Sequence, residues 1–171
     1  MTPDNIILGD GVFYLDEDPI ALTRGGGQFV IEREYRPIEA DGDYGPVKGR
    51  IRKIKSTAKL TLNALELVPA QVVKLYPALQ ISTDVDGSTI TGKHKIESAD
   101  YQPEVIWVGE TLDGKAVRIT LQNAICLENL DWSLVDKEEV VPQVVYTATY
   151  LESARTTANI VTGKQIGRAH V

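Results

Sequence analysis

The sequence predicts a mainly β domain, a β-sandwich or partly open barrel with one short α-helix and a long projecting β-hairpin. Three observations predict this class. Turn signals such as Asp86-Gly87 and Asp113-Gly114 recur between alternating or β-branched runs along the 171 residues, which is typical of all-β folds. Only one segment places apolar residues at helical spacing. Finally, residues 28–56 are too polar to be mostly core.

The projecting hairpin is predicted within residues 28–56. Residues 29–38 form one strand, residues 47–55 return, and residues 40–46 connect them. Glutamates on the outgoing strand lie opposite lysines and arginines on the return strand, and such cross-strand pairs each stabilise a sheet by roughly 0.2–1 kcal/mol. A ribbon this polar either lies on the surface or projects toward a partner.

The next elements are a strand and the helix. Residues 59–65 alternate apolar and polar side chains, so we expect one face of this strand to be buried. The helix is predicted to begin at Pro69, because proline suits the first helical position. Pro77 limits it to about two turns, since proline inside a helix removes a hydrogen bond.

The C-terminal half predicts three further strands. Residues 105–108 are an unbroken apolar run, which indicates a strand buried on both faces or at an interface. Residues 116–121 alternate again, and Asp113-Gly114 before them is typical of a type I′ hairpin turn. Residues 144–150 are β-branched and aromatic, as strands prefer.

Composition excludes several classes of function. The chain has 18 Lys and Arg against 24 Asp and Glu, a net charge of −6, which excludes a basic nucleic-acid-binding surface over the whole molecule. No apolar run approaches the ~20 residues of a membrane helix, so we expect no membrane association. A local basic run at residues 48–55 lacks aromatic residues for base stacking. We interpret it as a structural or protein–protein element.

No pattern indicates an enzyme, a cofactor or a metal. Asp41 and Asp43 resemble the opening of a calcium loop, but the later glycine and glutamate ligands are missing, so a turn is the preferred interpretation. We expect His94 on the surface and Cys126 buried and unreactive, since its neighbours are apolar. The triplet Gly25-Gly26-Gly27 indicates a tight turn or a close backbone approach.

The last six residues have a different origin in our interpretation. Residues 166–171 (Ile-Gly-Arg-Ala-His-Val) can be encoded by ATC GGA AGA GCA CAC GTC, the start of a common sequencing adapter that continues with a stop codon. We therefore expect a single domain at residues 1–165, followed by a sequencing artefact at residues 166–171. The natural C-terminus would then lie beyond about Gln165.

Several segments resemble the major tail tube proteins of long-tailed phages and prophages. The resemblance rests on residues 5–11, 21–27 and 32–49, on residues 59–67 followed by a short helix, and on residues 128–132 before the last strand. It implies a β-sandwich or partly open barrel subunit that assembles into rings, and these rings stack into a hollow tube for DNA passage.

The resemblance also implies partners and a location. The chain would assemble with itself, with six subunits to a ring, and with tape-measure, tail-terminator and baseplate or initiator proteins, in the virion and, during assembly, in the host cytoplasm. DNA would only pass through the lumen. An acidic lumen suits this role because it repels phosphate. The hairpin would contact another subunit, and we expect the contact residues to be Asp41, Gly42, Asp43, Tyr44, Lys48, Arg50 and Arg52.

Two other classes of function stay open. A non-catalytic β-sandwich that binds carbohydrate could use Trp107, Trp132 or exposed tyrosines as stacking platforms, although the apolar run around Trp107 favours the core or an interface. A small β-barrel hydrolase ranks last, because no nucleophile and base are recognisable together in the sequence.

Overall fold

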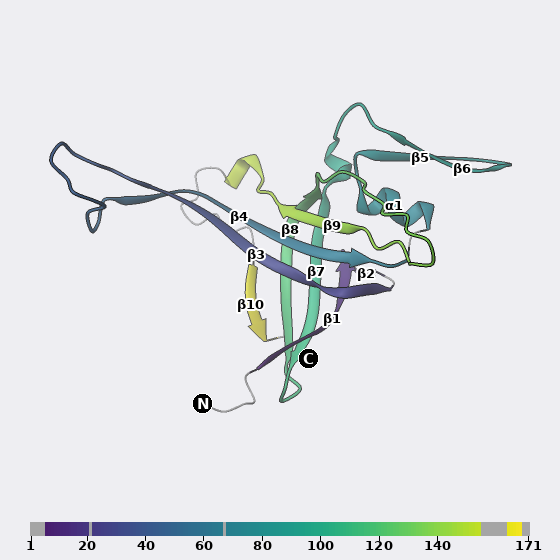
Figure 1. The fold of residues 1–171 in the computed structure, drawn as a ribbon, viewed down its shortest axis with the longest axis horizontal. Coiled ribbons are helices and arrows are strands. Elements are labelled where there is room, and N and C mark those ends of the chain that lie inside the picture. The colour runs from purple at the N-terminus through teal and green to yellow at the C-terminus, as the bar shows by residue number, and fades with distance from the viewer. Residues whose placement is uncertain (1–5, 21, 67, 155–163, 169–171) are drawn as a thin grey trace.

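The computed structural model describes residues 6–20, 22–66, 68–154 and 164–168, and its fold is mainly β, as predicted. One large antiparallel sheet dominates it (Figure 1). Its strands follow the spatial order β2 (Asp18–Pro19), β1 (Ile7–Leu15), β7 (Gln102–Thr111), β8 (Ala116–Cys126), β9 (Gln143–Ala148), β4 (Ile51–Ala64) and β3 (Thr23–Pro37).

The large sheet divides at β8 and bends into a partly open barrel. The C-terminal end of β8 pairs with β9, whereas its N-terminal half pairs with β10 (Lys164–Arg168). Strands β1 and β3 lie far apart in the strand order but meet in space, because a Cβ atom added to Gly27 would lie 2.5 Å from Cζ of Phe13. Gly27 thus provides the close backbone approach that its triplet indicated.

The core fills the inside of this bent sheet. On β4, Ala58, Leu60, Leu62 and Ala64 are buried in alternation, which confirms the predicted strand at residues 59–65 and extends it. Along β7, the unbroken apolar run predicted at residues 105–108 is largely buried. Burial of such side chains supplies most of the stabilising free energy of a domain of this kind.

Helix α1 (Pro69–Leu75) closes one side of the core and has proline at its start, as predicted. Its side chains Val72 and Leu75, and Tyr76 directly after it, are buried in the core. The hydroxyl group of Tyr76 donates a hydrogen bond to the carbonyl of Gln143 at 3.2 Å. The helix is therefore attached to β9 by packing and by a polar contact.

The predicted hairpin at residues 105–121 is confirmed, but its turn type is wrong. Asp113 does not have a positive φ, whereas Gly114 has φ 76°. The amide of Thr111 donates to the carbonyl of Lys115 at 2.9 Å, which leaves a three-residue loop. Such loops combine a type I turn with a left-handed glycine. Asp-Gly satisfies both geometries, so the dipeptide could not distinguish them.

A second, smaller hairpin was not predicted. It consists of β5 (Leu79–Asp84) and β6 (Gly87–Gly92), which form a separate two-stranded sheet. Short 3-10 helices follow at Ser98–Asp100 and Glu152–Ala154. The carboxylate of Asp100 is buried and accepts a hydrogen bond from the amide of Glu97 at 2.8 Å, and it pairs with Lys93.

Several predictions about single residues are also settled. His94 is exposed and Cys126 is buried, both as expected. Part of the segment expected to be an artefact, residues 166–168, lies in β10, while residues 169–171 lie outside the described residues, as do Asn5, Ala21 and Leu67 of the segments that carry the resemblance. No helix in the described part of the chain is long and apolar enough to cross a membrane.

Candidate subunit-contact site

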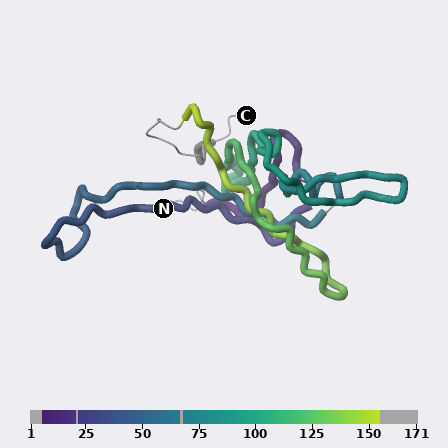
Figure 2. The backbone as a smooth tube through the Cα atoms, turned by 90° about the horizontal axis from the view of Figure 1, so that it is seen from above, coloured from purple at the N-terminus to yellow at the C-terminus, as the bar shows by residue number. Residues whose placement is uncertain are grey.

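The candidate site lies on the distal part of the β3–β4 hairpin, residues 31–55, which we call the arm. The two strands leave the body side by side and extend far from it (Figures 1 and 2). Every residue of the arm except Asp43 is exposed. A two-stranded hairpin alone is only marginally stable in water. An arm of this length is therefore held mainly by the pairing of its own two strands.

The tip of the arm is organised around Asp43. Its carboxylate accepts hydrogen bonds from the amide of Ala40 at 2.8 Å and from the guanidinium of Arg50 at 2.9 Å. Gly42 has φ 93°, a left-handed conformation that favours glycine. Tyr44 is fully exposed beside it. Of the predicted contact residues, Asp41, Gly42, Asp43, Tyr44 and Arg50 therefore lie together at the tip.

The remaining two predicted contact residues, Lys48 and Arg52, carry charges that face solvent. Lys48 and Arg52 are exposed and form no salt bridge with any described residue. Residues 47–55 contain five basic residues and no acidic one. The return strand of the arm therefore carries a run of positive charge, whereas the whole arm, residues 31–55, holds seven basic and five acidic residues.

The predicted pairing of opposite charges along the arm is only partly right. Glu34 lies opposite Lys55, as expected, but Glu32 lies opposite Thr57 and forms its salt bridge with Lys59, at 2.9 Å. Arg36 lies opposite Arg52, a pairing of like charges. The register shift between Glu34 and Tyr35 changes the partner of Arg36 from Lys53 to Arg52, so Arg36 faces a like charge in either register. Like charges opposite each other destabilise a free hairpin.

The arm is also amphipathic, a property that the predicted contact set missed. Ile31 lies opposite the buried Ala58, so its side chain continues the core face of the sheet beyond the body. Tyr35 lies on the same face, because side chains alternate along β3, and Ile51 joins it through its pairing with Pro37. All three apolar side chains are exposed. Arg33, midway between Ile31 and Tyr35, lies on this face too, so the alternation along β3 indicates a face of mixed apolar and basic side chains.

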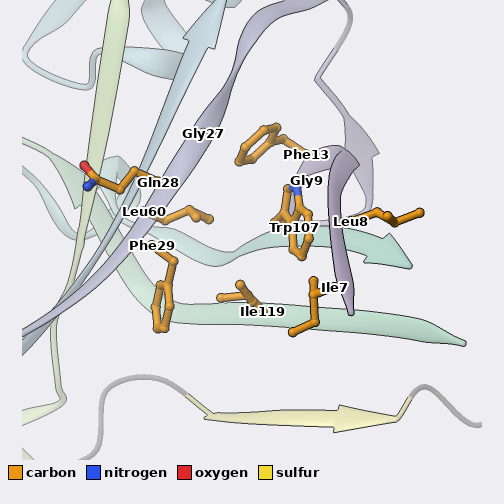
Figure 3. A pocket seen from close by; sticks show the side chains of 10 residues that line it. All are labelled: Ile7, Leu8, Gly9, Phe13, Gly27, Gln28, Phe29, Leu60, Trp107 and Ile119. Carbon is orange, nitrogen blue, oxygen red and sulfur yellow. The ribbon is translucent and has the colours of Figure 1, made fainter. Parts of the chain in front are cut away.

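A small apolar pocket lies where β1 and β3 approach each other (Figure 3). Its volume is about 230 Å³, and its lining includes Phe29, Trp107 and Ile119. None of its ten lining residues is an acid, a base or a nucleophile. The pocket therefore contains no group that could transfer a proton or attack a substrate.

The side chains that could act as nucleophiles, acids or sugar-stacking groups lie outside this pocket or are buried in the core. Burial raises the pKa of the Cys126 thiol, which keeps it protonated and unreactive. Burial likewise raises the pKa of Tyr76 to about 12. Trp107 is only 9% exposed, so it is no stacking platform for a sugar. Among the described residues, no three His, Cys, Asp or Glu side chains are close enough to hold a metal ion.

Comparison with known proteins does not identify a family. No protein-family model matches the chain, and no curated protein sequence matches it significantly.

Proposed function

We propose that this chain is a structural, non-catalytic subunit that assembles with itself into stacked rings forming the hollow tail tube of a phage. The observation that carries the proposal is the exposed, amphipathic arm at residues 31–55. Exposed apolar side chains on a marginally stable ribbon are characteristic of a surface that is covered in an assembly. The resemblance described above supports the tube as the form of that assembly.

Two further features support a repeated structural unit. The sheet is open at both ends of its strand order, at β2 and at β3, and neighbouring subunits that pair with these edges would protect them. The net charge of −6 is suited to a lumen through which DNA passes without binding. In this proposal the subunit resides in the virion and also contacts tape-measure, terminator and baseplate proteins.

Charge reversal on the arm tests this proposal. In a variant that carries Lys48→Glu, Arg50→Glu and Arg52→Glu, we expect a folded monomer that no longer assembles, because these side chains are exposed and none supports the core. Size-exclusion chromatography with light scattering measures the assembly, and circular dichroism measures the fold. Normal assemblies from this variant would contradict the role of the arm.

A further inference from the structure

The loop between β8 and β9, residues 127–142, is the second unusual surface of the molecule. All of residues 127–139 are exposed, and apart from one turn the loop has no regular secondary structure. Loops of this length without secondary structure are uncommon in a folded domain and are usually functional or disordered. This one is anchored, because Arg24 and Glu139 form a salt bridge at 2.6 Å and the amide of Ala64 donates to the carbonyl of Pro142 at 3.1 Å.

The composition of the loop is complementary to that of the return strand of the arm, residues 47–55. It contains five acidic residues and one basic residue, whereas residues 47–55 of the arm contain five basic residues and no acidic one. The loop also exposes large apolar side chains; Leu134, for example, is 78% exposed. The arm offers exposed Ile31, Tyr35 and Ile51 in the same way. Both surfaces thus combine uncovered apolar groups with charges of opposite sign.

The loop cannot meet the arm of its own chain. Arg24, which holds the loop, lies at the start of β3, and the arm extends from the other end of that strand. At about 3.3 Å per residue, the distance along β3 from Arg24 to Pro37 is roughly 40 Å. Figures 1 and 2 show the arm and the loop on opposite sides of the body. A contact between them is therefore a contact between two copies.

We propose that the arm of one subunit docks on the acidic, apolar loop at residues 127–142 of a second copy of this chain. This inference rests on the proposed self-assembly and specifies the surface that receives the arm. The contact joins two different surfaces, so each subunit keeps a free arm and a free loop. Repetition of such a contact closes a ring or extends a filament.

A charge-swap experiment tests the pairing directly. The loop variant carries Asp131→Lys and Glu138→Lys, and the arm variant carries Lys48→Glu and Arg52→Glu. We expect each variant alone to reduce the assembled fraction at least tenfold in sedimentation. A chain that carries all four substitutions, or an equimolar mixture of the two variants, should assemble again, because opposite charges then face each other.

The matched control reverses the same number of acidic charges on the other hairpin. Asp84 and Asp86 are exposed near the tip of the β5–β6 hairpin, so Asp84→Lys with Asp86→Lys changes the net charge equally and should leave assembly intact. Circular dichroism verifies that each variant is folded.

The possible outcomes separate this inference from the proposed function. If the wild-type chain assembles and the loop variant assembles equally well, the arm docks elsewhere and the inference is overturned. If the loop variant fails and the four-substitution chain also fails, the loop is required but is not the partner of the arm, which overturns the pairing. If the wild-type chain itself stays monomeric, the proposed function fails and this inference fails with it.

Discussion

The close approach of β3 to β1 predicts a large effect of a very small substitution, Gly27→Ala. The added Cβ atom would lie 2.5 Å from Cζ of Phe13 and 2.5 Å from the carbonyl oxygen of Thr61. Because Cβ contacts below 3.0 Å essentially never occur, each neighbour would have to move by at least about 0.5 Å. Phe13 is buried and the Thr61 oxygen belongs to the backbone of β4, so neither moves easily.

The expected cost follows from overpacking, which typically destabilises by ~1–3 kcal/mol. For a domain of this size that lowers the melting temperature by roughly 3–10 °C. Gly9→Ala is the control, because its Cβ would meet no atom within 4 Å, and a tolerated Gly→Ala change stabilises by ~0.4–1 kcal/mol. Thermal unfolding of both variants, at dilutions where the chain is monomeric, measures the difference. Equal stability of the two variants would refute the described contact between β1 and β3.

Two further predictions concern titratable groups. Hydrogen bonding by the amide of Glu97, and then by Lys93, lowers the pKa of Asp100 from its ordinary 3.8. The contribution of Asp100 to stability is therefore present above about pH 4 and is lost as the pH falls below that value. In urea unfolding, the stability difference between wild type and Asp100→Asn should shrink below about pH 4, and a difference that does not change with pH would contradict this. Burial raises the pKa of Cys126, so a thiol reagent at pH 8 should label the folded chain far more slowly than the urea-unfolded chain, and equal rates would show that the thiol is accessible.

The fold was largely predictable because its elements have local signals. The alternation at residues 59–65, Pro69 at the helix start and Asp113-Gly114 before β8 each identified their element. The β5–β6 hairpin was missed because its strands are mostly Ser, Thr and Gly, which carry little hydrophobic pattern. Side-chain alternation identifies a strand, but not which strands meet across the barrel, as Gly27 and Phe13 do.

The candidate site was predictable in its position but not in its character. The charged ribbon was visible in the sequence, and five of the predicted contact residues lie together at its tip. Of its apolar face, the alternation that places Ile31 and Tyr35 together was visible in the sequence, whereas the register shift between Glu34 and Tyr35, which brings Ile51 onto the same face, was not. The apolar surface of the loop at residues 127–142 could not be predicted either, since only the structure shows that its leucines are exposed.

Negative-stain electron microscopy of the purified chain over a range of concentrations tests the central claim, self-assembly through the arm, most directly. We expect rings or hollow tubes at high concentration, and only dispersed particles for the variant with Lys48→Glu, Arg50→Glu and Arg52→Glu. Single subunits at every concentration of the wild-type chain, or tubes from the arm variant, would contradict it.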